Sequence, residues 1–360
     1  MTEAAALDDA RHVDQGISKG ACLPLAGVPF AVKNLFDIEG IPTRAGSRIN
    51  RDHPPADADA FLSARLKAAG AILMGGLNMG EYAFDFTGEN IHDGNCLNPR
   101  DTGRMSGGSS SGSGSAVASG MVPVALGSDT NGSIRVPSSF CGLFGLKPTY
   151  GRLSRHGTFP FVGSLDHLGP MTRSARDLAL VFDVLQGPDP MDPAQADKPV
   201  LATGSELDRG AEDLKVAVAG GYFRQNAEAE ALAAVDLVAA ALGSDREIDI
   251  PDAARARAAA YVITASEGAN LHFERIKTRA ADFDPDTRDR FLAGTLIPAH
   301  WVQQAHRFRS WFRAAMRKIF EDVDIILAPA TPFPVASPTD SAPMSPGASL
   351  PAPWGSASPH

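Results

Sequence analysis

The chain has 360 residues, of which 44% are hydrophobic and 21% are charged, a composition typical of one large or two ordinary globular domains. Its formal net charge of −9 argues against direct nucleic-acid binding. No apolar run approaches the ~20 residues that cross a bilayer, and the polar N-terminus does not resemble a secretory signal. Three widely spaced cysteines, Cys22, Cys96 and Cys141, argue against a disulfide framework or a zinc site and favour a cytoplasmic location.

The N-terminal half alternates between strand and helix patterns. Small residues, apolar spacing and glycine stops predict strands at 27–34, 71–76 and 121–127, and helices at 57–70, from 77–84 onward, and at 115–121. The strands are short and almost wholly apolar, as in sheets that are buried on both faces. This half therefore predicts an α/β fold.

The chain changes character after about residue 175. Amphipathic or Ala-rich patterns predict helices at 174–187, 227–243, 253–276 and 301–323, with strands at 214–221 and 324–330. Pro, Ala, Ser and Gly dominate residues 333–360, so we expect that tail to be disordered.

A cluster of glycine and serine, GGSSSGSGS, occupies residues 107–115. A flexible linker is the ordinary reading of such a composition, but this cluster runs straight into a predicted helix. It lacks the G-K-[ST] ending and the G-x-G-x-x-G pattern of phosphate-binding loops. A G-x-S-x-G match surrounds Ser110, but the residues before it are polar and turn-like where a nucleophile elbow needs a strand. We read that match as accidental.

A second serine, Ser133, sits in the small polar turn SDTNGSIR that follows the predicted strand 121–127. A catalytic serine needs a base, and His92 and His167 are the nearest histidines. For each histidine, a structural role as a hydrogen-bonded residue is favoured over a role as the catalytic base. A lysine kept neutral by burial is the other option, and Lys33 ends an apolar run. The residues alone still favour a lysine that extends from a strand end into solvent.

Taken together, three segments resemble the amidase signature family: GVPFAVKN around Lys33, GGSSSGSGSA at 107–116, and GSDTNGSIRVPSSFCGLFGLKPTYGRLS at 127–154. They occur in the family's order, and SLDHLGPMTRSARDL and APATP add to the match. The resemblance covers roughly residues 25–332. It implies the amidase signature fold, with a mixed central sheet covered by helices on both faces.

The resemblance also implies a Ser–cisSer–Lys triad. By motif position the nucleophile is Ser133, the bridging serine after a cis peptide bond is Ser109, and the base is Lys33. Backbone N–H groups of Thr130, Asn131, Gly132 and Ser133 would form the oxyanion hole. No metal or organic cofactor is implied.

Within the family, segments such as LAGVPFAVKNLFDIEGI, RLSRHGTFPFV and YVITASEGANLH most resemble the carboxybiuret hydrolases of cyanuric acid degradation. That branch implies hydrolysis of a C–N bond of a small ureide such as 1-carboxybiuret, with release of ammonia. It also implies a small helical partner subunit. We expect in addition that the chain forms a homo-oligomer. The alternative is a glutaminase like that of the glutamyl-tRNA(Gln) or aspartyl-tRNA(Asn) amidotransferases. Activity on glutamine would distinguish such a glutaminase from the ureide hydrolase.

The predicted organisation is a polar lead at 1–24, a partial amidase domain at 25–332, and the tail at 333–360. Related proteins continue past the A-T-P segment into further strands, whose pattern is missing from the tail. We therefore expect a fold that is incomplete at its C-terminus. A truncated, catalytically impaired remnant is the third alternative.

Overall fold

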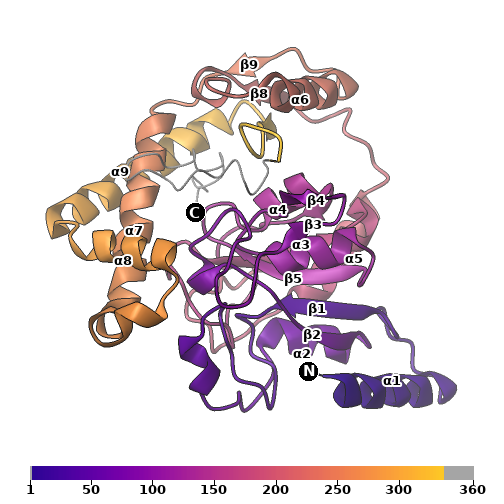
Figure 1. Cartoon of the computed structure of the whole chain (residues 1–360). Helices are drawn as coiled ribbons and strands as arrows, with labels where there is room; N and C mark the ends of the chain where they lie inside the picture. The colour runs from indigo at the N-terminus through magenta and orange to yellow at the C-terminus, as the bar shows by residue number, and fades with distance from the viewer. Residues whose placement is uncertain (1, 336–360) are drawn as a thin grey trace. The chain divides into compact units, whose positions relative to one another are not determined.

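The computed structural model describes residues 2–335, and the chain divides into two compact units (Figure 1). Unit 1 comprises Met1–Leu207 and Ala281–Thr287, and unit 2 comprises Asp208–Ala280 and Arg288–His360. The expected disordered tail lies outside the described residues, except for 333–335.

Unit 1 is built on a five-stranded sheet. Its strand order is β2 (Ile72–Leu77), β1 (Pro29–Lys33), β5 (Val124–Asp129), β7 (His167–Thr172) and β6 (Phe144–Gly145). Strand β1 pairs parallel with both β2 and β5, whereas β7 pairs antiparallel with β5 and β6, so the predicted mixed α/β sheet is confirmed. Because β1 and β5 are parallel neighbours, their carboxyl ends, at Lys33 and Asp129, meet at one edge of the sheet.

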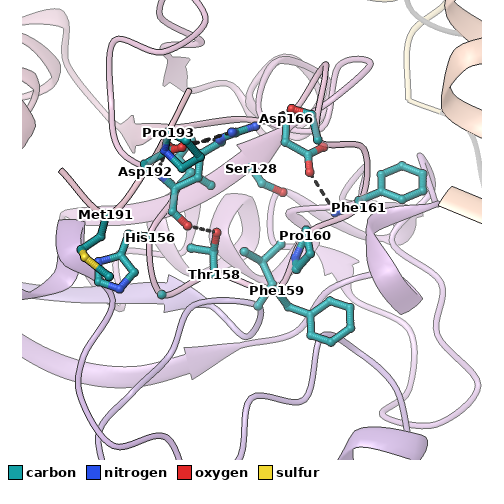
Figure 2. A pocket seen from close by; sticks show the side chains of 15 residues that line it. Ser128, His156, Thr158, Phe159, Pro160, Phe161, Asp166, Met191, Asp192 and Pro193 are labelled. Carbon is teal, nitrogen blue, oxygen red and sulfur yellow. Dashed lines mark hydrogen bonds and ion pairs between the residues drawn. The ribbon is translucent and has the colours of Figure 1, made fainter. Parts of the chain in front are cut away.

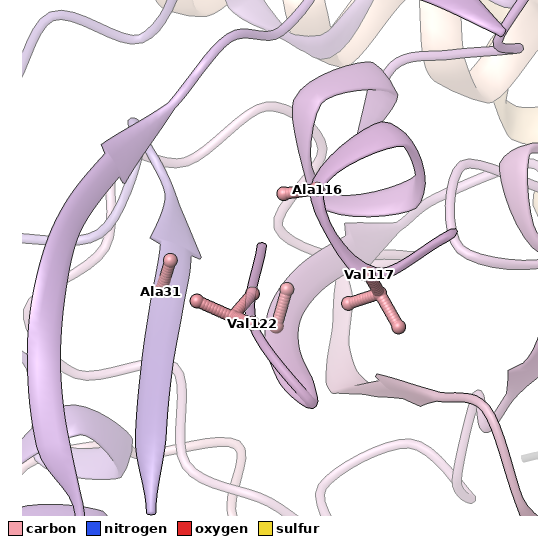
Figure 3. Packing of buried hydrophobic residues seen from close by; sticks show 5 residues of the cluster. Ala31, Ala116, Val117 and Val122 are labelled. Atoms are coloured by element: carbon pink, nitrogen blue, oxygen red, sulfur yellow. The ribbon is translucent and has the colours of Figure 1, made fainter. Parts of the chain in front are cut away.

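Helix α3 (Ser111–Ala118) packs against β1 and β5 through small side chains. Figure 3 shows Ala116 and Val117 of this helix beside Ala31 of β1 and Val122, and Ala125 completes the buried cluster. Small residues allow a helix and a sheet to approach closely. The hydrogen bond of 3.1 Å from the Ser110 hydroxyl to the Ser128 carbonyl places the start of α3, two residues after Ser109, near the carboxyl end of β5.

Four more α-helices belong to unit 1: α1 (Glu3–Ser18), α2 (Phe61–Ala68), α4 (Arg135–Cys141) and α5 (Ala175–Leu185). Helices α1 and α2 contact β2, α5 contacts α2 and β7, and α4 contacts α3 and β6. Ser174 caps α5 by accepting a hydrogen bond from the Asp177 N–H group. A hairpin of β3 (Leu97–Asn98) and β4 (Asp101–Met105) and the 3₁₀ turns η1 (Ile49–Asp52), η2 (Glu81–Ala83) and η3 (Thr203–Glu206) complete unit 1.

Unit 2 has a parallel sheet of β10 (Ile325–Leu327), β8 (Val216–Ala219) and β9 (Glu247–Ile248). Its helices are α6 (Ala229–Ala241), α7 (Ala253–Arg279) and α9 (Ala299–Ile319), and α8 (Pro285–Thr295) begins in the part of the chain assigned to unit 1. The 3₁₀ turns η4 (Gly221–Phe223) and η5 (Ala280–Asp282) lie beside α6 and α7 in the sequence. Phe312 and Met316 of α9 pack against Ala256 of α7.

Most of the predicted elements are present with shifted ends. The helix predicted at 57–70 begins only at Phe61, because the N–H groups of Ala60 and Phe61 donate to the carbonyls of Asp37 and His156 instead. The structure also contains elements that we did not predict, namely α1, α4, α8, β3, β6, β7 and β9. Within residues 2–335, no helix combines the length and apolarity that crossing a bilayer requires.

Two local predictions are wrong. Residues 77–84 do not begin an α-helix: Leu77 ends β2, and Glu81–Ala83 form the short turn η2, in which Tyr82 and Ala83 adopt positive φ. Tertiary hydrogen bonds cause this, since the Tyr82 N–H group donates to Ala45 and that of Gly80 to Ser109. The residues before Ser110 are also not turn-like throughout, because β4 pairs with β3 there; four residues still separate β4 from Ser110.

Candidate active site

Lys33 is the last residue of β1 and its side chain is completely buried. Its Nζ donates hydrogen bonds to Ser109 Oγ at 2.7 Å and to Ser128 Oγ at 2.9 Å. The predicted contact between Lys33 and Ser109 is therefore present, although 76 positions separate the two residues in the sequence. The alternative of a lysine extending into solvent is wrong.

Burial lowers the pKa of Lys33 from 10.5 to about 7, and the negative charges of Asp129, Asp85 and Asp166 oppose that fall. An ammonium group without bulk water loses its hydration, so the neutral amine is favoured. Near neutral pH a large fraction of Lys33 is therefore unprotonated and able to accept a proton.

Ser109 lies between β4 and α3 in the sequence, and its backbone contacts the loop that follows β2. The peptide bond between Gly108 and Ser109 is cis, as the family resemblance implies. The Ser109 carbonyl accepts a hydrogen bond from the Gly80 N–H group at 3.3 Å. At the second residue of α3, a Cβ on Gly112 would lie 2.5 Å from the Asn78 backbone nitrogen, so only glycine allows this approach.

Ser133 follows β5 and is 3% exposed. The carbonyl of Ser133 accepts a hydrogen bond from the Ser110 N–H group at 3.3 Å, so the two serine segments are neighbours. A side-chain hydrogen bond between Ser109 and Ser133 is not formed within the described part of the chain. That step of the predicted relay stays a prediction.

Asp129 organises the turn that carries Ser133. Its completely buried carboxylate accepts hydrogen bonds from the N–H groups of Gly132 and Ile134, at 2.8 and 3.1 Å, and from the guanidinium of Arg135 at 2.7 and 2.9 Å. Burial alone would raise the pKa of Asp129, but the charge and hydrogen bonds of Arg135 hold it well below its usual range. We did not predict this role, although an aspartate at the carboxyl end of a buried strand is a signal for it.

One expected oxyanion donor is already engaged. Because the Gly132 N–H group donates to Asp129, an oxyanion would have to share it with the carboxylate. The N–H groups of Thr130, Asn131 and Ser133 lie in the same turn. Thr130 is held by a hydrogen bond of 2.6 Å from its Oγ1 to Asp166.

A pocket of about 300 Å³ opens beside this turn in unit 1 (Figure 2). Ser128, which is hydrogen-bonded to Lys33, lines it together with Asp166, whose pKa burial raises. The Arg155 guanidinium, also in the lining, forms an ion pair with Asp192 at 3.2 Å. The pocket therefore reaches to within one hydrogen bond of the buried lysine.

The two histidines bond to other groups, although His167 lies opposite Asp129 in the pairing of β5 with β7. His92 Nε2 lies 3.0 Å from Glu81 Oε1, and His167 Nδ1 lies 2.6 Å from the Leu165 carbonyl. Burial lowers the pKa of both rings, that of His167 to about 3. Ser110, the serine of the G-x-S-x-G match, is buried and donates to the Ser128 carbonyl at 3.1 Å.

The chain is similar in sequence to known amide-hydrolysing enzymes and amidotransferase subunits. The family model described as Amidase matches residues 1–348. The chain is 55% identical to AtzE, the 1-carboxybiuret hydrolase subunit of Pseudomonas sp. (strain ADP), over 90% of this chain and 71% of that protein. It is 36% identical to a glutamyl-tRNA(Gln) amidotransferase subunit of Geobacter sp. (strain M21), over 93% of this chain and 74% of that one.

Solved structures of related proteins superpose on this chain. One structure, of a vestigial protein complex that reveals the evolutionary origins of an s-triazine catabolic enzyme, superposes with a TM-score of 0.91 at 54% identity, over 92% of this chain and 73% of that one. A glutamyl-tRNA(Gln) amidotransferase subunit of Thermotoga maritima superposes with a TM-score of 0.78 at 30% identity, over 90% and 73% of the two chains. The chain therefore belongs to the amidase signature family, closely related to 1-carboxybiuret hydrolase, and is an amide-hydrolysing enzyme.

Proposed function

We propose that the enzyme hydrolyses a C–N bond of a small ureide, of the 1-carboxybiuret type, by a relay of Lys33, Ser109 and Ser133. The observation that carries this proposal is the hydrogen bond of 2.7 Å between Lys33 and Ser109, buried beneath the turn that presents Ser133. A buried amine whose pKa is lowered to about 7 is a suitable general base at neutral pH.

In this mechanism neutral Lys33 accepts a proton from Ser109 as Ser109 accepts one from Ser133. The Oγ of Ser133 bonds to the amide carbon, and backbone N–H groups of the turn stabilise the oxyanion. The C–N bond then breaks as the proton passes back to the leaving nitrogen, which departs as ammonia. Water, activated by the same relay, cleaves the acyl ester and regenerates Ser133.

The substrate class rests on similarity. The relative that is 55% identical is named for 1-carboxybiuret hydrolysis, and 1-carboxybiuret has a terminal amide whose nitrogen would leave as ammonia. The other product would be a dicarboxylated urea. A glutaminase of an amidotransferase is the second candidate, because the Geobacter amidotransferase protein is 36% identical over 74% of its length.

We further propose that residues 25–332 act as one amidase domain in the cytoplasm. The free state of all three cysteines supports that compartment. The proposal includes a homo-oligomer and a small partner subunit. Two observations support a partner: the first relative is named as one subunit of its enzyme, and the similar solved structure is a complex.

The test is ammonia release by the purified full chain, with 1-carboxybiuret and with glutamine as substrates. We expect release from the ureide and little from glutamine; the reverse preference would favour the glutaminase. Labelling by a serine-directed fluorophosphonate should disappear in Ser133→Ala and slow strongly in Lys33→Ala. The matched controls His92→Ala and His167→Ala should still be labelled. If either histidine variant lost its labelling while Lys33→Ala was still labelled at the wild-type rate, the lysine relay would be refuted.

A further inference from the structure

In the folded chain the Asp85 side chain lies between the backbones of Gly80 and Gly108, next to Ser109. A Cβ on Gly80 would lie 2.3 Å from Asp85 Cβ, and a Cβ on Gly108 would lie 2.2 Å from Asp85 Oδ2. Both distances are far below van der Waals contact, so the backbone at Gly80 and Gly108 packs directly against the Asp85 side chain. Gly108 is the residue immediately before Ser109, so Asp85 packs against the backbone that carries the bridging serine.

The Asp85 carboxylate also organises the turn that holds this backbone. Its Oδ1 accepts hydrogen bonds from the Thr87 N–H group at 2.8 Å and from Thr87 Oγ1 at 2.7 Å, and its Oδ2 accepts one from Gly88 at 2.8 Å. The carbonyl of Phe86 accepts from the Gly108 N–H group at 2.8 Å, and that of Thr87 accepts from Gly107 at 3.1 Å. The turn capped by Asp85 is therefore the one to which the glycine–serine segment is bonded.

The charge of Asp85 reaches the buried lysine. After the large effect of burial, the negative charges of Asp129, Asp85 and Asp166 raise the pKa of Lys33, in that order. Asp129 is paired with the guanidinium of Arg135, whereas the three hydrogen-bond donors to Asp85 are all uncharged. Glu89 lies in the same turn, where its carboxylate is 2.9 Å from the Thr87 hydroxyl, and it is not among the charges that act on Lys33.

We propose that Asp85 is a positioning residue, which fixes the Gly107–Ser109 segment and supplies a negative charge to the Lys33–Ser109 pair. This rests on the proposed function, because it assigns a role within the same serine–lysine relay. In the relay, that charge sets the pH at which Lys33 becomes a base, and the hydrogen bonds set where Ser109 lies.

The test is the pH dependence of fluorophosphonate labelling in Asp85→Asn, with Glu89→Gln as the matched control. Asparagine preserves the shape but removes the charge, so Lys33 should lose its proton at a lower pH. We expect the acid limb of the labelling rate to move down by roughly 0.5–1 pH unit. The plateau rate should also fall, because the amide cannot accept from both Thr87 and Gly88. Glu89→Gln should keep the acid limb of the wild type, because Glu89 is not among the charges that act on Lys33.

The outcomes separate the two proposals. Labelling that survives in Ser133→Ala or keeps its full rate in Lys33→Ala would refute the proposed function itself. Labelling that depends on both residues, with the same acid limb in Asp85→Asn as in the wild type, would refute only the role of Asp85. If Asp85→Asn does not fold, Asp85→Ser provides the same test with a smaller neutral side chain, and it should show the same downward shift of the limb.

Discussion

Replacing Lys33 by methionine removes a buried amine while keeping most of its volume. Burial lowers the pKa of Lys33 from 10.5 to about 7. At about 1.4 kcal/mol per pH unit, this corresponds to a penalty on the order of 5 kcal/mol against the charged amine in the folded protein. Ser109 and Ser128 lose their donor in the variant, which costs about 1–3 kcal/mol and does not depend on pH.

The pH dependence of stability follows from whether Lys33 holds its proton in the folded and in the unfolded chain. Between about pH 7 and pH 10.5 the unfolded chain keeps the proton on Lys33 while the folded chain has released it, so wild-type stability rises with pH. The penalty is fully present below about pH 7 and is relieved by pH 10.5. Lys33→Met lacks this slope, and we expect it to be the more stable protein at acidic pH.

The assay is urea-induced unfolding of both proteins, followed by far-UV circular dichroism from about pH 6 to about pH 9. Between about pH 7 and about pH 9 the wild type should gain about 2 kcal/mol relative to Lys33→Met. The control is Lys198→Met, which removes an exposed lysine and should leave the pH dependence of the wild type unchanged. Parallel stability curves for wild type and Lys33→Met would show that Lys33 keeps its proton in the folded state, and the general-base argument would fail.

Three further predictions concern the surroundings of the lysine. Ser133→Ala should lower turnover by at least three orders of magnitude with little loss of stability, measured as ammonia release beside thermal unfolding; near-normal turnover would place the nucleophile elsewhere. Gly112→Ala should destabilise by about 1–3 kcal/mol, because its Cβ would meet the Asn78 backbone, whereas Gly163→Ala has open space and should be tolerated; equal unfolding midpoints would contradict this. Asp129→Asn should cost about 3–5 kcal/mol at neutral pH, because it leaves the Arg135 guanidinium without its carboxylate. Since the pKa of Asp129 is lowered in the folded protein, its contribution is present above the ordinary value of 3.8 and is lost as the pH falls below it, so the variant and the wild type should converge in acid.

Local patterns in the sequence determined much of the fold. The apolar run that ends at Lys33 and the one that precedes Ser133 predicted β1 and β5, and 3.6-residue spacing predicted the helices from α5 onward, apart from α8. These elements were predictable because their signal lies within a dozen neighbouring residues. The order of the three motifs in the sequence also identified the family, which the comparisons confirmed.

The tertiary structure alone decided where polar side chains meet. No local pattern shows that Lys33 donates to Ser128, that Asp129 holds the turn of Ser133, or that Asp85 packs against Gly108. Strand β7 escaped prediction because it is buried on both faces and contains Gly169 and Pro170, so it has neither alternation nor a typical strand composition. The turn at 77–84 was missed because its backbone donors bond to residues distant in the sequence. Secondary structure follows from spacing along the chain, whereas the pKa of Lys33 follows from burial and from charges that only the folded chain brings together.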